Sequence, residues 1–218
     1  MGLMNSMYHK GFFISFEGID GCGKSSIIAY LNTILNITTT VNIREPGGTI
    51  ISEDIRYMLL NNKNNDMASE TEALLYAAAR SQVVKQVIIP ALAQGKMVLA
   101  DRFTDSTIAY QGYGRGLDLN YLKVLNDFCT GGLSPDLTFL LDLEPEQSYG
   151  YKKGLAPDRI ESEGLEFQRL VRNGYLQMAA AEPDRIIRID AAQEFSKVRE
   201  VVLNHIQRVV GQVLGEDI

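Results

Sequence analysis

Short runs of apolar residues alternate along the chain with longer stretches in which apolar residues recur every three or four positions. The short runs predict five strands, at residues 12–16, 39–44, 97–101, 137–143 and 185–190. The longer stretches predict helices, for example around Ile51, Ile55 and Leu59 and in a C-terminal segment from Val198 to Val213. Strands that alternate with helices are typical of βαβ units. We therefore predict an α/β protein whose five-stranded, mainly parallel sheet has helices on both faces.

One segment interrupts this pattern. Residues 149–162 are polar, include Gly150, Gly154 and Pro157, and carry few apolar side chains that could pack. We expect a mobile loop here, and such loops often act as lids over binding sites.

Composition narrows the class of protein but names no function. The 218 residues suit a single domain, residues 1–218, and the 45% hydrophobic content is that of a globular protein. A net charge of −6 disfavours nucleic acid as a partner. Cys22 and Cys129 are the only cysteines, which argues against a disulfide framework, and no apolar run approaches the roughly 18 residues of a membrane span. We expect a cytoplasmic protein with no membrane partner.

A phosphate-binding motif follows the first predicted strand. Residues 18–25, GIDGCGKS, fit the pattern GxxxxGK[ST] and come directly before a predicted helix, as a P-loop requires. The glycines let backbone N–H groups turn towards phosphates, Lys24 adds a positive charge, and the Ser25 hydroxyl can ligate Mg²⁺. The nucleotide-binding residues assigned in this way are Gly18, Asp20, Gly21, Cys22, Gly23, Lys24, Ser25 and Ser26. We therefore predict the P-loop NTPase fold.

The reaction must be inferred from other residues, because GTPases, motor ATPases and small-molecule kinases share the P-loop. A GTPase should carry a guanine-reading NKxD element late in the chain, whereas residues 62–65 read NKNN and lie early. Motor ATPases usually need larger or repeated modules. A kinase that acts on a small acceptor remains.

An arginine is predicted inside a helix. Arg80 falls on the same helical stripe as Ala73, Ala77 and Val84, so its guanidinium points towards the interior, where Tyr76 would share its pocket. A buried cation needs an anionic or carbonyl partner. A ligand, a structural carboxylate or a path to the surface would each satisfy Arg80.

Charged residues also follow the third predicted strand. Asp101 and Arg102 come at its carboxyl end, where open α/β sheets bind ligands. Asp101 could hold a Mg²⁺-bound water and Arg102 a phosphoryl oxygen, while Thr107, Tyr110 and Gln111 share one side of the next helix. Arg44 ends the second strand and Arg56 lies in the following helix. Together with Arg80 and Arg102 they make four arginines that converge on one edge of the sheet. This clustering predicts a bound phosphomonoester.

Several segments together resemble thymidylate kinase of the bacterial type. The resemblance covers about residues 11–193 and rests on FEGIDGCGKS at 16–25, REPGGT at 44–49, YAAAR at 76–80, DR at 101–102, AYQGY at 109–113, SPDLT at 134–138, DRIE at 158–161 and IDA at 189–191. It implies transfer of the γ-phosphate of Mg-ATP to dTMP, with ATP and Mg²⁺ as cofactors and a homodimer as the assembly.

The resemblance also implies roles for individual residues. In the dTMP site it places Asp20 at the sugar 3′-hydroxyl, Arg44, Arg56 and Arg102 at the phosphate, Glu45 and Pro46 beside them, Tyr76 stacked on thymine, Arg80 at O4, Thr107 and Gln111 at N3, and Tyr110 against ribonucleotides. The adenine of ATP should lie near Ala191 and Gln193. The catalytic residues would be Lys24, Asp101, Arg102 and a cation from the lid.

The lid cation departs from the family pattern. Gly21 excludes a catalytic arginine in the P-loop, and the lid reads Tyr151, Lys152 and Lys153 where bacterial relatives carry arginines. We assign the role to Lys153, with Lys152 and Arg159 as alternatives. Two other functions stay open: a kinase of another nucleoside monophosphate or deoxynucleoside, and a nonenzymatic P-loop regulator.

Overall fold

The computed structural model describes residues 11–35, 39–151 and 157–214. Its strands are β1 (Phe12–Glu17), β2 (Thr40–Arg44), β3 (Met97–Asp101), β4 (Leu137–Asp142) and β5 (Ile186–Asp190). They form one sheet in the order β2-β3-β1-β4-β5, and every neighbouring pair is parallel. All five predicted strands and the α/β class are confirmed. Because the strands are parallel, their carboxyl ends share one edge, and the site lies there.

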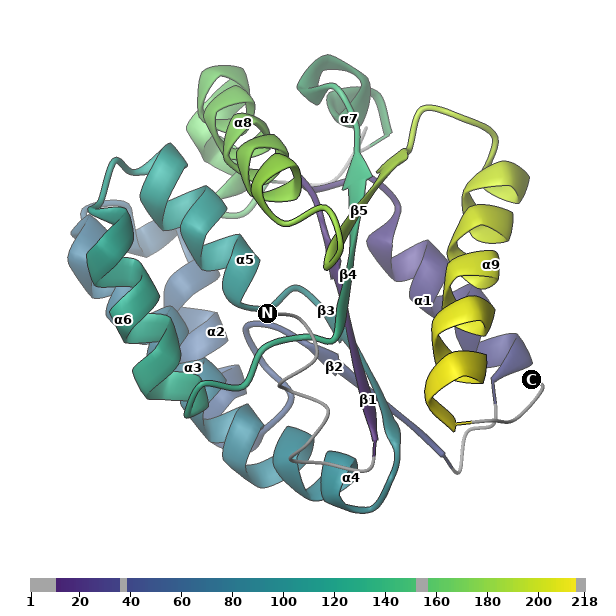
Figure 1. The fold of residues 1–218 in the computed structure, drawn as a ribbon. Helices are drawn as coiled ribbons and strands as arrows, with labels where there is room; N and C mark the ends of the chain where they lie inside the picture. Colours follow the sequence, from purple (N-terminus) through teal and green to yellow (C-terminus); the bar gives the residue numbers. More distant parts are fainter. Residues whose placement is uncertain (1–10, 36–38, 152–156, 215–218) are drawn as a thin grey trace.

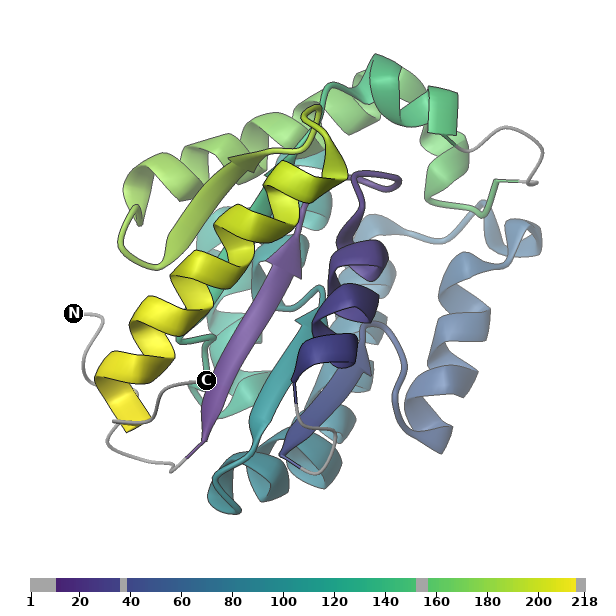
Figure 2. The same cartoon turned by 90° about the vertical axis from the view of Figure 1, so that its right-hand side faces the viewer.

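Helices cover both faces of the sheet. The longer ones are α1 (Lys24–Ile34), α2 (Ile50–Leu60), α3 (Ser69–Val83), α6 (Leu119–Thr130), α8 (Gly164–Ala181) and α9 (Phe195–Leu214). Shorter ones are α4 (Ile89–Ala93), α5 (Thr104–Thr107) and α7 (Pro145–Tyr151). Figure 1 shows α1 and α9 on one side of the sheet and α2, α3, α5, α6 and α8 on the other. Figure 2 looks onto the first side, where β1 runs between α1 and α9. None of the described helices is long and apolar enough to cross a bilayer.

The apolar pattern of β1 explains why both faces are covered. Ile14 and Phe16 belong to the core cluster that includes α1 and α9, whereas Phe13 belongs to a second cluster with Val83 and Val98. Phe13 also packs edge-on against Phe103, with ring centroids 4.9 Å apart. A strand buried on both faces requires the continuous apolar run that the sequence carries.

Local signals fix where the helices begin and end. Thr49 caps α2 by accepting a hydrogen bond from the Ser52 N–H, and Asp118 caps α6 by accepting one from Tyr121. Gly131 ends α6 with φ 67°, a left-handed conformation that favours glycine. Both helices pack against α3, the helix that carries Arg80.

Two helical stretches widen into π-helix. They are η3 (Val84–Ile88), which continues α3, and η4 (Ile108–Gly114), which continues α5. Such widenings are frequent at functional sites. Here η4 carries Tyr110 and Gln111, two of the predicted site residues.

The predicted bounds of the loop, residues 149–162, are wrong at both ends. Residues 149–151 continue α7, and Glu161–Glu163 form the short 3₁₀ helix η5. Ile160 and Arg159 are buried, because Ile160 joins the main core and Arg159 has a buried ionic partner, Glu72. One apolar residue and one paired arginine thus anchor a segment that its polar composition did not predict to pack. Residues 152–156 lie outside the described residues.

Candidate active site

The P-loop connects β1 to α1 at the carboxyl edge of the sheet. Gly18, Gly21 and Gly23 have φ values of 134°, 78° and 100°, in the region that favours glycine. A Cβ atom on Gly18 would lie 2.4 Å from the Leu141 carbonyl oxygen, so no other residue fits there. Lys24 begins α1 and is buried, and its Nζ donates hydrogen bonds to the carbonyls of Gly18 and Ile19 at 3.2 and 3.0 Å.

Ser25 and Asp101 meet beside this loop. The Ser25 hydroxyl donates a hydrogen bond to Asp101 Oδ2 at 2.8 Å, although the two residues are 76 positions apart. Hydroxyl and carboxylate oxygens are ligands that Mg²⁺ accepts, and Mg²⁺ typically takes only one or two protein ligands besides waters and substrate phosphates. Within the described ranges no cluster of three or more His, Cys, Asp or Glu side chains could hold a metal. The pair therefore fits Mg²⁺ that is held jointly with a nucleotide.

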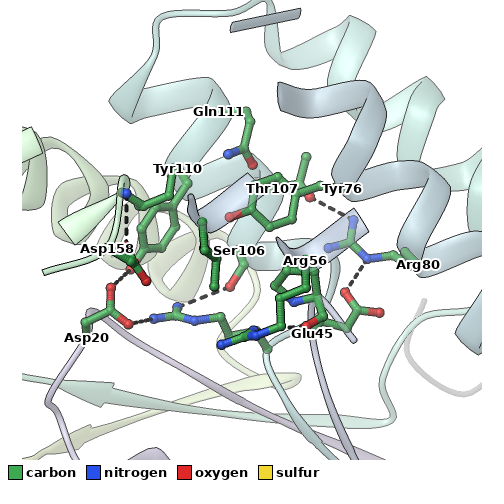
Figure 3. Close-up of a pocket in the computed structure, with 14 residues that line it drawn as sticks. Asp20, Glu45, Arg56, Tyr76, Arg80, Ser106, Thr107, Tyr110, Gln111 and Asp158 are labelled. Carbon is green, nitrogen blue, oxygen red and sulfur yellow. Dashed lines mark hydrogen bonds and ion pairs between the residues drawn. The ribbon is translucent and has the colours of Figure 1, made fainter. Parts of the chain in front are cut away.

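A pocket opens next to the P-loop (Figure 3). It is lined by side chains from several elements: Asp20, Glu45, Pro46, Arg56, Leu60, Tyr76, Arg80, Arg102, Ser106, Thr107, Tyr110, Gln111, Asp158 and Ile160. Ten of the predicted acceptor-site residues are among them. The pocket thus combines aromatic rings with amide, hydroxyl and guanidinium groups.

Arg80 lies at one end of this pocket with only 2% of its surface exposed. Its Nε donates to Glu45 at 2.7 Å, Nη1 donates to Thr107 and Asn126 at 2.7 and 3.0 Å, and Nη2 donates to the Phe103 carbonyl at 3.1 Å. The prediction of a buried, partnered arginine is confirmed, and a path to the surface is excluded. A guanidinium has five N–H groups; these bonds use four of them, and the Cys129 thiol also interacts with the guanidinium.

Glu45 pairs with Arg80 through one oxygen only. Its other oxygen, Oε1, is buried and has no hydrogen-bond partner among the residues that the structure describes. Burial raises the pKa of Glu45 to about 7, because desolvation outweighs the attraction of Arg80.

Arg102 lies at the other end, between the pocket and the P-loop. It is in a left-handed conformation with φ 75°, which is strained for a residue with a side chain. Its guanidinium forms an ion pair with Asp20 at 2.6 Å and donates to the Gly18 carbonyl at 2.8 Å. The N–H of the next residue, Phe103, donates to the buried Glu17 carboxylate at 2.6 Å, which holds the strained turn. Burial would lower the pKa of Arg102, but Tyr110 and Asp20 raise it well above its ordinary value, so Arg102 stays a cation.

Comparisons with known proteins identify the family of the chain. The model of the family described as "Thymidylate kinase" matches residues 16–202. The thymidylate kinase of Desulforudis audaxviator is 50% identical over 188 residues, which are 85% of each chain, and that of Kosmotoga olearia is 48% identical over 88% of this chain and 93% of its own. The chain belongs to the thymidylate kinase family. A crystal structure of thymidylate kinase from Ehrlichia chaffeensis has a TM-score of 0.74 at 34% identity and covers 90% of this chain and 99% of its own, in agreement with the P-loop NTPase fold.

Some residues expected at a thymidylate kinase site lie apart from the pocket. Arg44 does not line it, because its exposed guanidinium pairs with Glu53 at 3.2 Å. Arg56 does line it and donates to the Pro46 carbonyl at 2.9 Å. Ala191 and Gln193 follow β5 at the same edge of the sheet as the P-loop, and the Ala191 N–H donates to the Asp142 carbonyl at 2.9 Å.

The lid residues divide into two groups. Arg159 is buried, forms an ion pair with Glu72 at 2.7 Å and donates from Nε to the Leu59 carbonyl at 2.7 Å. Its charge is therefore paired inside the protein, which disfavours the predicted alternative that Arg159 serves as the lid cation. Lys152 and Lys153 lie outside the described residues.

Sequence reasoning missed four residues of the pocket, namely Leu60, Ser106, Asp158 and Ile160. Two signals were present. Ser106 lies one turn before Tyr110 on a helix already assigned to the site, and Asp158 belongs to the DRIE segment of the family resemblance. Burial raises the pKa of Asp158, which indicates that its carboxyl faces a poorly solvated space.

Proposed function

We propose that the pocket of Figure 3 is the dTMP site of this thymidylate kinase, and that ATP binds along the P-loop. The reaction moves the γ-phosphate of ATP to dTMP and gives dTDP and ADP. One observation carries the assignment of the pocket: a buried guanidinium, Arg80, lines it at the end away from the P-loop, while Arg102 lies between the pocket and the P-loop. A nucleotide that places its base at Arg80 therefore directs its phosphate towards Arg102.

The base is read by polar groups at the Arg80 end. Arg80 donates to O4 of thymine, Gln111 and Thr107 contact the N3 edge, and the Tyr76 ring stacks on the base. The buried Tyr110 ring lies near the sugar, with Arg102 over its face at 5.0 Å, and leaves little room for a 2′-hydroxyl.

The phosphates meet at the Arg102 end. Asp20, which pairs with Arg102, contacts the 3′-hydroxyl, and Arg102 holds the dTMP phosphate with Arg56 and Arg44 nearby. On the donor side, Lys24 exchanges its own loop carbonyls for ATP phosphates. Ser25 and Asp101 would hold Mg²⁺, Asp101 through a water, and the ion would neutralise charge on those phosphates. In-line placement and positive charge are the main demands of phosphoryl transfer.

The lid contribution rests on Lys153. Because Arg159 is committed to Glu72, Lys152 and Lys153 are the remaining cations of this segment, and we keep Lys153 as the residue that stabilises the transferred phosphoryl group. The adenine lies near Ala191 and Gln193.

We also propose a homodimer in the cytoplasm. Adjacent helices α2, α3 and α6 carry large apolar side chains that are more than 40% exposed: Ile50, Ile51, Tyr57, Met58, Leu74, Tyr121, Val124 and Phe128. Large exposed apolar side chains on adjacent helices are typical of interfaces, and twofold homodimers are the commonest assembly that covers such a surface. Sedimentation equilibrium should give twice the mass of one chain; a monomer at micromolar concentration would contradict this.

A coupled assay with dTMP, dUMP, dCMP, dGMP and thymidine tests the substrate. We expect dTMP to have the highest kcat/KM by at least tenfold over dCMP, because the pocket offers a donor to O4. Preference for another monophosphate or for thymidine would identify a different kinase, and no transfer to any acceptor would favour a nonenzymatic regulator.

A further inference from the structure

A buried carboxylate lies directly behind the pocket. Glu72, in the first turn of α3, is fully buried and is not part of the pocket lining. Its Oε1 accepts a hydrogen bond from Gln111 Nε2 at 2.9 Å. Arg115 donates to both oxygens at 3.2 and 3.0 Å, and Arg159 forms an ion pair with Oε2 at 2.7 Å. Glu72 thus joins a residue of the base site to two structural arginines.

Glu72 is ionised in this environment. Burial acts to raise its pKa, but hydrogen bonds from Arg115 and Gln111 outweigh burial and leave the pKa below its ordinary value. An ionised carboxylate can only accept hydrogen bonds. The part of the Gln111 amide that faces Glu72 must therefore be the NH₂ group.

This restriction fixes the other half of the Gln111 amide. With its nitrogen turned to Glu72, the amide oxygen lies on the opposite side, and Figure 3 shows it turned towards Thr107 in the pocket. A glutamine without such a partner can rotate and present either an acceptor or a donor. Glu72 thereby converts an adaptable side chain into a fixed acceptor.

We propose that Glu72 is a specificity-determining positioning residue: by holding the Gln111 oxygen towards the base, it selects pyrimidines whose N3 carries a proton and rejects those whose N3 is an acceptor. The proposal rests on the proposed dTMP site. Thymine donates from N3 to this oxygen, whereas 5-methylcytosine, which keeps the methyl group and the ring shape, places a lone pair against it. A polar group that is left unpaired in this way is costly, so it supports strong discrimination.

The test compares dTMP with 5-methyl-dCMP in the full-length wild type and in Glu72→Gln. A neutral amide at position 72 can donate or accept, so Gln111 regains both orientations. We expect the ratio of kcat/KM for dTMP over 5-methyl-dCMP to fall about tenfold, the effect of one hydrogen bond. The change should come from KM, raised for dTMP and lowered for 5-methyl-dCMP, with kcat for dTMP within about twofold of wild type.

Arg115→Gln is the matched control. It removes one guanidinium from the same carboxylate but leaves the bond between Gln111 and Glu72. We expect a lower Tm, as for Glu72→Gln, with the substrate ratio within about twofold of wild type. An unchanged ratio in Glu72→Gln, or an equal fall in both variants, would overturn the proposal.

The design also covers a variant that does not fold, and it separates failure of the dTMP site from failure of the role of Glu72. If Glu72→Gln does not fold, the double variant Glu72→Gln, Arg115→Gln removes the carboxylate together with one of its cations, and the same fall in the ratio is expected. A wild type that does not prefer dTMP to 5-methyl-dCMP would refute the dTMP site itself. A wild type that discriminates, beside variants that do so equally, would refute only the role of Glu72.

Discussion

The acceptor and donor halves of the site are built by different means. In the acceptor half, Arg80 is buried and holds four hydrogen bonds, and Gln111 is buried against Glu72. In the donor half, Gly21 and Ser25 are exposed, and Lys24 is bonded to carbonyls of its own loop. Base selection therefore depends on side chains whose positions are fixed by folding, whereas phosphate binding depends on backbone N–H groups and on a cation that changes partners when ligand binds. Substitutions should separate the two halves. Those in the acceptor half should affect stability as well as binding, whereas those in the donor half should affect mainly turnover.

The largest effect is expected from Arg80→Ala. At pH 8, where Glu45 is mostly ionised, it leaves the buried Glu45 carboxylate without its cation, and removal of one partner of a buried pair typically costs about 3–5 kcal/mol. The KM for dTMP should rise far more than the KM for ATP, because Arg80 lies at the acceptor end. Urea denaturation and steady-state kinetics measure the two effects.

Arg169→Ala is the control for this substitution. Arg169 also forms an ion pair, with Glu146, but both side chains are about half exposed, and surface pairs of this kind contribute little to stability because water screens them. Equal destabilisation by the two substitutions would show that burial of Arg80 is not the cause, and equal changes in both KM values would place Arg80 outside the acceptor site.

The next largest effect is expected from Lys24→Ala, which should lower kcat and leave the stability of the fold almost unchanged. Removal of one positioned charge that stabilises a transition state typically lowers kcat by roughly a hundredfold to a thousandfold. The free energy of unfolding should change by about 1 kcal/mol or less, because the hydrogen bonds of Lys24 among the described residues go only to loop carbonyls and the Cys22 sulfur. Rapid-quench measurement of phosphoryl transfer and thermal denaturation test the two halves of this expectation; a kcat within tenfold of wild type would contradict it.

The same contrast explains what could be predicted from the sequence. The phosphate-binding loop of the donor half is encoded within one continuous segment, residues 18–25, so its place after β1 followed from the motif alone. The need of Arg80 for a partner also followed from its helical register. Its actual partners, Glu45 and Asn126, are 35 and 46 positions away and depend on how α3 packs against other elements, which no local pattern encodes.

The prediction of a mobile loop around Arg159 was wrong for a related reason. Its composition predicted a loop, and the partner that buries it, Glu72, lies in α3. A charged residue in a polar stretch gives no local sign that its charge is neutralised inside the protein. Glu72 itself had no assigned role, because its contact with Gln111 exists only in the folded chain.

The smallest effect is expected from Glu45→Gln, which should change how the stability of the protein depends on pH. Burial raises the pKa of Glu45 from its ordinary 4.5 to about 7, so between these values the folded protein keeps a proton that the unfolded chain has released. The folded state then binds more protons than the unfolded state, and the free energy of unfolding must fall as pH rises from about 4.5 to about 7 and level off above. Glutamine does not titrate, so this contribution, at most about 3 kcal/mol, disappears in the variant.

Other buried carboxyls also titrate, so the quantity to follow is the difference in the free energy of unfolding between wild type and Glu45→Gln. The pKa values of Glu17 and Asp158 are also raised by burial, and they contribute the same sign of slope in wild type and variant alike. Urea denaturation of both proteins at pH values from 5 to 8 should therefore show that Glu45→Gln gains stability relative to wild type as pH rises. Parallel curves would mean that Arg80 keeps Glu45 ionised throughout, and the acceptor half would then contain a permanently charged pair instead of a carboxyl that titrates near neutral pH.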